Sequence, residues 1–508
     1  MDIRCHVGSA RPAVVLYPSG AEVTFAQLDS DANRLAHHLR NAGLVPGDAL
    51  AILMENNQHI HAVMWAARRC GLYYTPINTH LTTAEIAYIV ADCGAKAIVA
   101  SSALREICAG LDAQLPDGLP AVALIADDEL EGWQSYPGCL DGAPAAPFPT
   151  ERVGQLLQYS AGSTGRPKGI RRPPNPEGAS VPLTTPVFEA LGVGSDSVYL
   201  SPAPIYHTAP AMWTMAAQSV GATTVVMERF DAEGALDCIQ RYAVTHAQFV
   251  PTMFVRMLRL PEAARTRYDL SSLQRVVHAA APCAPEIKKQ MIDWWGRIID
   301  EYYGSSEGVG VSFIRAEEWL EHPGSVGRPL LGTPHVLDEH GTELAPGEIG
   351  EIYFAGGYRF DYLNDAEMTA AATSEQGWVT VGDIGYVDTD GYLFLTDRRN
   401  NVIISGGVNI YPQEIEHVLI THPLVVDAAV FGMPDSDLGQ TVTAVVELVD
   451  PAAASTDVAD ELMSWVRDRL AHYKCPRSIT LDRLPRTDAG KLYKNRLIER
   501  HVENGRPT

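Results

Sequence analysis

The chain has 508 residues, more than a single hydrophobic core usually organises, so two or more domains are expected. Its formal net charge of −23 disfavours general nucleic-acid binding, which needs clustered lysine and arginine side chains. No apolar run reaches the ~18 residues of a membrane span, and the N-terminus lacks a signal-peptide core, so a cytoplasmic protein is expected.

Helix and strand patterns alternate through the first part of the chain. TFAQLDSDANRLAHHLRNAG has apolar residues at helical spacing, namely Leu28, Ala32, Leu35 and Leu39. A strand pattern (DALAILMENN), a helix pattern (HIHAVMWAARRCG) and a further helix and strand ending at AKAIVAS follow. The segment 116–150 is rich in proline, glycine and alanine, and we expect it to form irregular surface.

The alternation resumes in SVYLSPAPI, GATTVVMERF and ALDCIQRYAVTHAQFVP, which indicates a mostly parallel, layered sheet. Beyond residue 340 the pattern becomes β-rich with Asp-Gly turns, and a small α+β unit follows it. The expected fold class is therefore α/β. A large N-terminal domain of layered, mostly parallel sheets plus a β-rich subdomain spans 1–399, and a small mobile α+β C-terminal domain spans 400–508. A hinge is expected near Asn400.

The stretch YSAGSTGRPKGI, residues 159–170, is a glycine-rich loop. Such a loop offers N–H and O–H donors to phosphate oxygens without obstructing side chains, and Lys168 adds a positive charge. The P-loop pattern fails, because Lys168 follows Pro167 and precedes Gly169 where that pattern has Gly and Ser or Thr. The loop is interpreted as phosphate-binding, with a flexible linker as the alternative.

Eight motifs in order carry a resemblance to a known family. YSAGSTGRPKG resembles the phosphate loop of the adenylate-forming superfamily, which includes acyl-CoA synthetases, peptide-synthetase adenylation domains and beetle luciferases. The other motifs similar to that family are PIYHTAP, AAAP, EYYGSSEG, GEIGEIYFAGG, GWVTVGDIG, DRRNNVIISGGVNIYPQEIE and PRTDAGKLYKNRL. The resemblance covers nearly the whole chain and points to the acyl-CoA synthetase, or fatty-acid–CoA ligase, branch.

The resemblance implies a two-step reaction. A carboxylate attacks the α-phosphorus of ATP, pyrophosphate leaves, and the CoA thiol then takes the acyl group from the adenylate and releases AMP. Positioned donors and cations offset the charge that builds on the transferring phosphate. The implied cofactors are ATP, Mg²⁺ and coenzyme A. The implied phosphate-cradling residues are Ser160, Gly162, Ser163, Thr164, Gly165 and Lys168.

The resemblance also assigns the remaining site residues. The adenine side comprises Tyr303, Gly304, Ala280, Ala281 and Pro282. Asp383 would accept hydrogen bonds from the ribose with help from Arg398, and Gly406 and Gly407 would lie beside the pantetheine. Four residues are implied in catalysis: Lys168; Glu307, which would hold Mg²⁺; Lys491, which would bridge the carboxylate and the α-phosphate; and His207, which would line the acyl pocket or gate the thiol. Ser306 would donate to the α-phosphate.

Each of these residues also has an ordinary alternative without a functional role. Glu307, Asp383 and Lys491 could be solvated surface charges, Tyr303 a half-buried aromatic residue, and His207 a loop or core histidine. The chain also departs from the family at Ala161, Val381 and Asn400, and in RRPPNPEG, which follows the loop. That doubly basic, proline-rich segment borders the acyl side in the family, so an atypical substrate is expected.

Small apolar residues along the expected pocket favour a hydrophobic acid, either a medium- or long-chain fatty acid or a bulky alicyclic or steroid-like acid. Alternatives are an aryl-acid CoA ligase, a stand-alone adenylation enzyme that loads a carrier protein, and a non-catalytic nucleotide-binding protein. The expected partners are the small-molecule acid, ATP and CoA, without nucleic acid or a membrane span. A homodimer is one option for assembly. The basic stretch 471–508 is either a solvated tail or, through Lys474 or Arg477, attracts the CoA phosphates.

Overall fold

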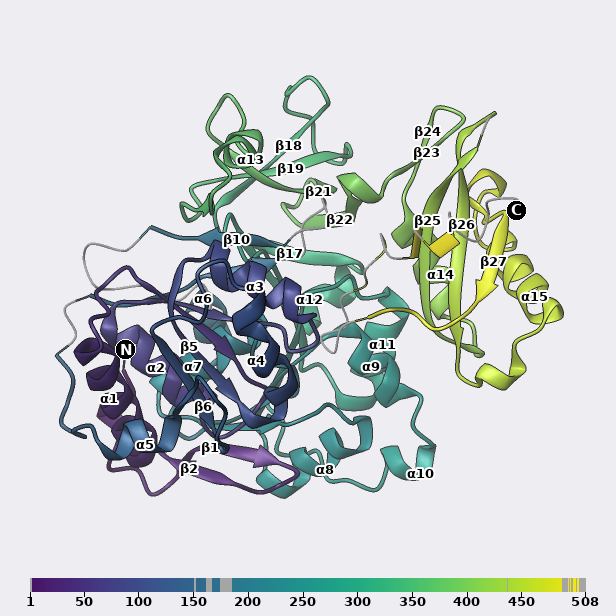
Figure 1. Cartoon of the computed structure of the whole chain (residues 1–508). Coiled ribbons are helices and arrows are strands. Elements are labelled where there is room, and N and C mark those ends of the chain that lie inside the picture. Colours follow the sequence, from purple (N-terminus) through teal and green to yellow (C-terminus); the bar gives the residue numbers. More distant parts are fainter. Residues whose placement is uncertain are drawn as a thin grey trace.

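The computed structural model describes residues 2–149, 152–160, 167–173, 185–435 and 437–486, and single residues between 492 and 501. Figure 1 shows a large body that contains the first 400 residues and a smaller yellow-green body that contains the rest. Within the described residues, no helix has both the length and the apolar character of a membrane span. The mixed α/β architecture, with a large sheet-rich N-terminal part and a small C-terminal part, is the one expected.

The first sheet has six strands, all paired in parallel, in the order β7-β6-β5-β3-β4-β8. Its strands are β3 (Ala49–Leu53), β4 (Tyr73–Pro76), β5 (Ala95–Ser101), β6 (Val122–Ala126), β7 (Gln134–Ser135) and β8 (Gln155–Leu156). The helices between them are α2 (Ile60–Cys70), α3 (Thr83–Asp92), α4 (Arg105–Leu111) and α5 (Tyr136–Asp141). Strands in a parallel sheet need such crossover helices, which explains the alternating sequence pattern.

The second sheet has thirteen strands and runs through the rest of the large body. Its parallel half consists of β1 (Pro12–Tyr17), β11 (Val198–Ser201), β12 (Thr223–Met227), β13 (His246–Phe249), β14 (Arg275–His278) and β15 (Ile299–Gly304), with β2 (Glu22–Thr24) antiparallel at the edge. Its antiparallel half consists of β16 (Val311–Ile314), β17 (Ser325–Leu331), β22 (Leu393–Arg398), β21 (Val379–Val387), β19 (Gly350–Ala355) and β18 (Thr333–Leu337). The antiparallel half includes the β-rich region predicted beyond residue 340, but it begins earlier, with β16, β17 and β18.

Helices cover this second sheet and connect its strands. They are α6 (Thr185–Leu191), α7 (Thr208–Ser219), α8 (Ala232–Tyr242), α9 (Pro251–Leu258), α10 (Glu262–Arg265), α11 (Pro285–Trp295), α12 (Ala316–Glu321) and α13 (Ala366–Ala371). A three-stranded sheet of β9 (Gln158–Ser160), β10 (Lys168–Arg171) and β20 (Asp361–Tyr362) lies apart from both large sheets.

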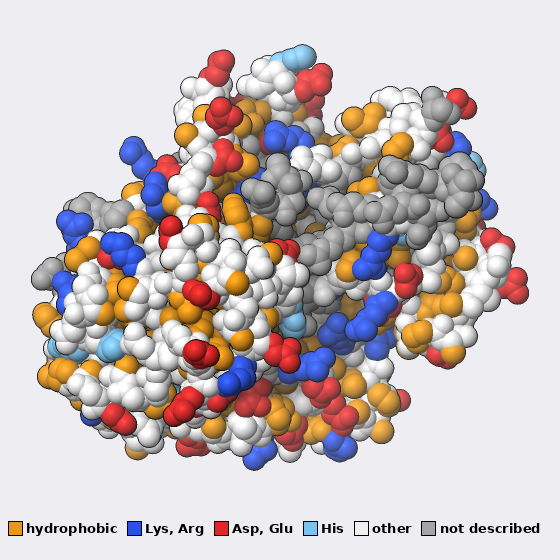
Figure 2. Space-filling view, in the orientation of Figure 1, with side chains coloured by type: hydrophobic (Ala, Val, Ile, Leu, Met, Phe, Trp, Pro, Cys, Tyr) orange, Lys and Arg blue, Asp and Glu red, His pale blue; other side chains and the backbone are white. Residues whose placement is uncertain are grey.

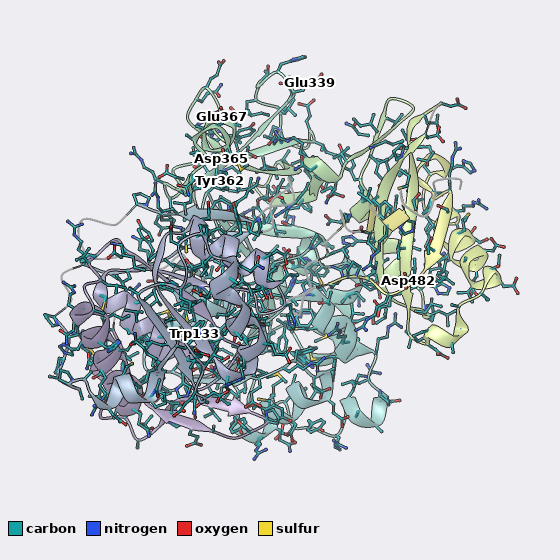
Figure 3. All side chains as sticks on the ribbon, in the orientation of Figure 1. Trp133, Glu339, Tyr362, Asp365, Glu367 and Asp482 are labelled. Carbon is teal, nitrogen blue, oxygen red and sulfur yellow. The ribbon has the colours of Figure 1, made fainter. Side chains whose placement is uncertain are left out.

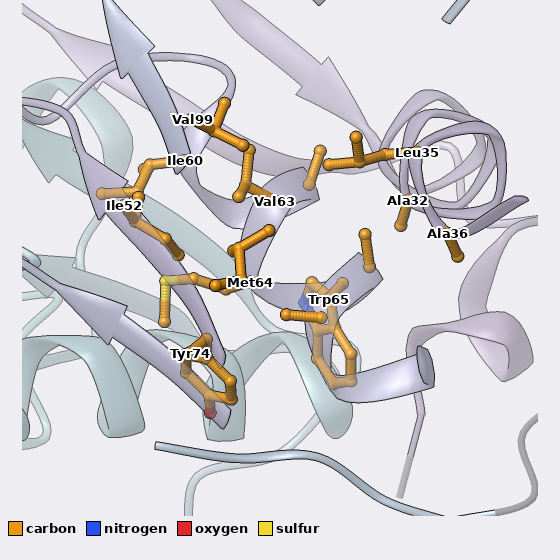
Figure 4. Packing of buried hydrophobic residues seen from close by; sticks show 14 of the residues in the cluster. Ala32, Leu35, Ala36, Ile52, Ile60, Val63, Met64, Trp65, Tyr74 and Val99 are labelled. Carbon is orange, nitrogen blue, oxygen red and sulfur yellow. The ribbon is translucent and has the colours of Figure 1, made fainter. Parts of the chain in front are cut away.

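Helix α1 (Phe25–Asn41) shows why the predicted elements form where they do. Thr24 caps its first turn in a capping box with Gln27, which satisfies N–H groups that the helix leaves free. The four apolar residues predicted to recur on one face are all fully buried: Leu28, Ala32, Leu35 and Leu39. In Figure 4 this face packs on α2, whose Val63, Met64 and Trp65 lie between α1 and the six-stranded sheet.

The expectation of irregular surface across 116–150 is wrong in part. Residues Val122–Ala126 form β6, which is buried along its whole length and pairs in parallel with β5. A five-residue apolar run is long enough for a strand. The expectation was wrong because it rested on the composition of the whole segment 116–150, which is rich in proline and glycine. A short helix, α5, follows β6.

The small body has a core of its own. It contains β23 (Ile403–Ser405), β24 (Val408–Ile410), β25 (Val425–Asp435), β26 (Gly439–Leu448), β27 (Ser478–Leu481), α14 (Pro412–Ile420) and α15 (Thr456–Arg467). Its buried residues include Ile415, Val430 and Leu462. Asn400 lies in the short turn Arg399–Asn401 between β22 and β23, and the hinge assigned to it stays a prediction.

One arginine of the large body reaches the small one. The Arg259 guanidinium donates to the carbonyl oxygens of His422 (3.2 Å), Pro423 (3.1 Å) and Val425 (2.7 Å), which follow the end of α14. The His422 carbonyl also accepts a hydrogen bond from the Val425 N–H at 3.0 Å, so Arg259 adds contacts between the two bodies to a turn that is already hydrogen-bonded within the small one. Nearby, Ile420 packs against the core of the large body.

Charge is distributed unevenly over the surface. Figure 2 shows acidic side chains scattered over the face in view, while several Lys and Arg side chains lie near the boundary between the two bodies. Other Lys and Arg side chains are scattered over the large body in the same view.

A buried carboxyl group gives a pH-dependent stability. Asp300 on β15 is fully buried and accepts a hydrogen bond from the Ala316 N–H at 2.9 Å, and burial raises the pKa of its carboxyl to about 6. The folded protein therefore binds a proton that the unfolded chain releases near pH 4, so stability falls as the pH rises from about 4 through about 6.

Replacing Asp300 with asparagine should remove this fall in stability with rising pH. In the variant Asp300→Asn, the decrease in unfolding free energy between pH 4.5 and pH 7.5 should be about 1–3 kcal/mol smaller than in the wild type. Urea denaturation at the two pH values measures it. Asp293→Asn is the control, because Asp293 is exposed and pairs only with Lys289. An unchanged pH dependence in Asp300→Asn would contradict the assignment.

Candidate active site

The strands that flank the glycine-rich loop form a hairpin. Lys168 on β10 pairs with Ser160 on β9, and β20 joins the other edge of β10. A side chain at Gly169 would meet Tyr159 Cζ and Leu363 Cβ at 3.0 Å, so the hairpin packs tightly only with glycine there. Gly162, Ser163, Thr164 and Gly165 lie outside the described residues.

The residue implied as the metal ligand lies beside this hairpin. The Tyr362 hydroxyl donates to Glu307 Oε1 at 3.1 Å, and Lys168 Nζ lies 5.5 Å from the centre of the same tyrosine ring. Tyr362 therefore links the loop lysine to the carboxylate. Figure 3 shows Tyr362 near Asp365 and Glu367, at the start of α13.

Three predicted nucleotide residues form one network. The Tyr303 hydroxyl at the end of β15 donates to Asp383 Oδ2 at 2.5 Å, and Arg398 Nε donates to Asp383 Oδ1 at 3.1 Å. The register of β21 and β22 places Asp383 directly opposite Arg398. The Asp383 carboxylate, which is buried, raises the pKa of the Arg398 guanidinium and keeps it charged.

A buried ion pair supports this network from behind. Lys288 on α11 donates to Glu301 Oε2 at 2.7 Å, and His278 Nε2 lies 3.3 Å from the same oxygen. Burial raises the pKa of Glu301, but His278 and Lys288 outweigh burial and hold the pKa at about 2. The pair joins α11 to β15 and β14, so the strands that carry Tyr303 and the AAAP motif are fixed to each other.

The predicted acyl-side residues meet at the start of α7. The Ser306 hydroxyl lies 2.7 Å from the Thr208 hydroxyl, the first residue of α7, and His207 is the residue that precedes the helix. The His207 ring packs on Tyr206 with 4.6 Å between ring centres, and the carbonyl of Tyr206 accepts a hydrogen bond from Gln158 Nε2 at 3.1 Å. The PIYHTAP and EYYGSSEG motifs therefore lie side by side.

The AAAP motif follows β14 as a bend. Ala280 has a φ of +72°, in the left-handed region that non-glycine residues rarely adopt. Ala279 is buried and Ala280 is exposed, while Ala281 and Pro282 continue towards α11. The adenine-side role that the resemblance assigns to this bend stays a prediction. Gly304 is also exposed, at the end of β15.

An aromatic cluster closes the site underneath these motifs. Trp213 on α7 is buried and stacks on Tyr302 (5.3 Å between ring centres) and on Tyr199 (6.2 Å), and Phe188 packs against its other side at 4.8 Å. The Tyr302 hydroxyl also accepts a hydrogen bond from Gln248 Nε2 at 2.8 Å. Large rigid side chains thus fill the space behind the acyl-side residues.

Two further predictions concern the small body. Gly406 and Gly407 form the turn between β23 and β24, with φ values of +57° and +79° that favour glycine. Lys491 lies outside the described residues, while its neighbour Lys494 forms an ion pair with Glu416 at 2.7 Å.

Sequence reasoning placed Thr208 and Trp213 within the stretch 206–213 that was expected to line the acyl pocket, but it assigned no role of their own to Tyr362 and Arg172. The Arg172 guanidinium donates to the Ser306 carbonyl at 2.5 Å. It belongs to RRPPNPEG, the segment that departs from the family pattern, and two adjacent arginines among prolines were the available signal.

The arrangement suits an anionic nucleotide. Lys168, Arg172 and Arg398 are positively charged side chains near the Glu307 and Asp383 carboxylates, and the Ser306 and Thr208 hydroxyls lie together beside Arg172. Such preorganised donors and cations are what a phosphoryl transfer needs, because they stabilise charge without rearranging during the reaction.

Comparisons with known proteins agree with this geometry. The family model described as AMP-binding enzyme matches residues 3–360, and the one described as AMP-binding enzyme C-terminal domain matches residues 414–491. A feruloyl-CoA synthase of Amycolatopsis sp is 33% identical over 493 residues, which cover 96% of each chain. ScoC, a fatty acid–[acyl-carrier-protein] ligase of Streptomyces coeruleorubidus, is 30% identical over 96% of this chain and 93% of its own. Among solved structures, the amide bond synthetase McbA from Marinactinospora thermotolerans matches with a TM-score of 0.81 at 28% identity, over 97% of each chain.

Proposed function

Because the chain belongs to the AMP-binding enzyme family, we propose that it activates a hydrophobic carboxylic acid with a compact aromatic or alicyclic ring. It is an AMP-forming acid–CoA ligase, with ATP and CoA as substrates. In the first step the acid forms a bond to the α-phosphorus of ATP, and the bond to pyrophosphate breaks. In the second, the CoA sulfur bonds to the acyl carbon, and AMP leaves.

The single observation that carries the substrate class is the aromatic cluster. Trp213 lies on α7, the helix whose first residue contacts Ser306, and we place the acyl group against this cluster. A long flexible chain needs a deep channel there, and the close packing of Trp213 with Phe188, Tyr199 and Tyr302 fills that space, which favours a compact ring. The feruloyl-CoA synthase among the relatives is named for an aromatic acyl group.

A medium- or long-chain fatty acid is the second candidate, and ScoC, named as a fatty acid ligase that uses an acyl-carrier protein, favours it. The small side chains at Ala209 and Ala279 favour it as well, since they leave space near the reacting carboxylate. We rank it second because Trp213 and Phe188 occupy the region into which a chain would extend.

The residues assigned by resemblance keep their roles in this proposal. Tyr303 and the bend at Ala280 would hold adenine, and Asp383 with Arg398 would hold the ribose. Lys168 and the loop would hold the β- and γ-phosphates. Glu307 fits Mg²⁺, because the Tyr362 hydroxyl contacts only Oε1 of a carboxylate that can accept about four hydrogen or metal bonds. A bound Mg²⁺ would neutralise charge on the phosphate oxygens.

The small domain would turn between the two steps. We place its boundary near Asn400, with Lys491 facing the adenylate in the first step, and with Gly406 and Gly407 beside the pantetheine in the second. The turn Arg399–Asn401, which belongs to no strand, is where the chain can change direction. A cytoplasmic location and a homodimer stay predictions.

A panel of acids tests the proposal. The protein is incubated with ATP, Mg²⁺ and cinnamate, ferulate, benzoate, cyclohexanecarboxylate, octanoate or palmitate, with and without CoA, and AMP and acyl-CoA are measured. Ring acids should give the highest kcat/KM. Preference for palmitate would reverse the ranking of the two candidates, and acid-dependent AMP without acyl-CoA would point to a different acceptor, such as a carrier protein.

The aromatic cluster should set the size limit. In Trp213→Leu, kcat/KM for octanoate relative to cinnamate should rise by ~10-fold or more, because part of the indole volume becomes available to a chain. Trp65→Leu is the matched control: Trp65 is equally buried, but it lies in the core under α1 and donates to Gln218. The two variants should lose similar stability, and only the first should change the ratio. An unchanged ratio would remove Trp213 from the acyl pocket.

A further inference from the structure

The side chain of Arg172 is a half-buried cation that contacts no carboxylate in the described part of the chain. It directly follows β10, four residues after Lys168, and its Nε atom is buried without a hydrogen-bond partner among the described residues. Burial lowers the pKa of its guanidinium to about 10, and Glu307 is near enough to oppose that shift, so the group stays charged at neutral pH. Within the described part of the chain, no carboxylate forms an ion pair with it.

A partly buried charge without a hydrogen-bonded counter-ion is costly, so proteins pair such groups or present them to a ligand. Among the described residues, one of the five N–H groups of Arg172 has a hydrogen-bond acceptor, the Ser306 carbonyl at 2.5 Å. The backbone around it is held in place, because the Tyr73 hydroxyl donates to the Arg172 carbonyl at 2.9 Å. The guanidinium is therefore fixed, charged and only partly hydrogen-bonded, which suits it to bind an anion.

Its position indicates which anion. The Ser306 residue that it contacts carries the hydroxyl assigned to the α-phosphate, and that hydroxyl lies 2.7 Å from the Thr208 hydroxyl. The next residue is Glu307, beside Tyr362 and Lys168. A planar guanidinium can bind two phosphate oxygens at once, which an ammonium cannot do.

We propose that Arg172 is a further catalytic residue, which binds the α-phosphate of ATP and then of the acyl-adenylate in both half-reactions. This inference rests on the proposed function. In the proposed cycle Lys491 leaves the adenylate when the small domain turns, yet the phosphate must stay stabilised while the acyl–phosphate bond breaks and AMP departs. Arg172 belongs to the large domain and remains in place, so it supplies the positive charge in the second step.

Binding of AMP and of adenosine, measured by calorimetry without any acid, tests the contact itself. Arg172→Leu should weaken AMP binding by ~10-fold to ~100-fold and leave adenosine binding unchanged, as expected for a lost charge-assisted hydrogen bond. The AMP affinity of Arg172→Lys should lie between those of the wild type and Arg172→Leu. The matched control is Arg171→Leu: Arg171 is exposed and pairs with Asp361 at 3.7 Å, and the variant should behave as the wild type. Equal losses for AMP and adenosine would mean a structural role and would overturn the proposal.

Transfer of a supplied cinnamoyl-adenylate to CoA tests the second step. Arg172→Leu should lower the single-turnover rate by ~10-fold or more in an otherwise unchanged chain and also in the Lys491→Ala background. A normal transfer rate in Arg172→Leu would overturn the proposal. If the wild-type protein formed no acyl-adenylate from any acid yet lost AMP affinity in Arg172→Leu, the proposed function would fail while the phosphate contact stood.

Discussion

Lys491→Ala should reduce acyl-adenylate formation by ~10²-fold to ~10³-fold and leave the transfer of a supplied acyl-adenylate to CoA within ~3-fold of the wild type. The physical reason is that the attack joins two anions, the acid carboxylate and the phosphate chain, and a cation between them lowers the barrier. The assignment of this role to Lys491 rests on the terminal motif PRTDAGKLYKNRL.

Acid-dependent exchange of pyrophosphate into ATP measures the first step, and thioester formation from the supplied adenylate measures the second. Lys494→Ala is the control, because Lys494 is three residues away and pairs with Glu416 at 2.7 Å on the small domain. It should change both rates by less than ~2-fold. If both half-reactions fell together in a folded Lys491→Ala protein, the account with two orientations of the small domain would be wrong.

Asp383→Asn is expected to raise KM for ATP by ~10-fold to ~100-fold with a smaller effect on the KM for the acid. The substitution keeps the shape but removes the charge that holds Arg398 at 3.1 Å and that accepts from Tyr303 at 2.5 Å. Loss of a charged, buried acceptor costs more than loss of a neutral one, and here it also leaves a guanidinium without its partner.

Two variants separate the causes of that loss. Tyr303→Phe keeps the flat ring for adenine and removes only the hydrogen bond to Asp383, so its KM for ATP should rise less than in Asp383→Asn. Asp390→Asn, in the exposed turn between β21 and β22, should leave KM unchanged. Equal effects of Asp383→Asn on ATP and on the acid would contradict a contact with the nucleotide.

Local patterns predicted much of the fold. Leu28 and Leu35 recur at helical spacing, and Ala49–Leu53 is a continuous apolar run. Each pattern depends only on residues within the element, and α1 and β3 form as expected. The β6 strand was missed because its five apolar residues carry too weak a signal beside neighbouring prolines and glycines. The order of thirteen strands in one sheet depends on contacts between distant residues, and no local pattern specifies it.

The sequence predicted those candidate site residues that lie inside a motif of the family. Asp383 and Tyr303 were singled out separately, and the register of β21 with β22 then placed Arg398 on the same carboxylate. The partners that those motifs do not mention had to come from the structure. Tyr362 reaches Glu307 from 55 residues further along the chain, and Arg172 reaches Ser306 across 134 residues.

The contact between Arg259 and the end of α14 also bears on the timing of catalysis. Its three hydrogen bonds to carbonyl groups contribute about 0.5–1.5 kcal/mol each, so leaving this orientation costs a few kcal/mol. The hairpin of β23 and β24 exposes Ile404 (55%) and Val408 (45%), apolar surface that the other orientation can cover. Because each 1.4 kcal/mol changes a population tenfold, these few groups would set the relative populations of the two orientations that we propose for the small domain.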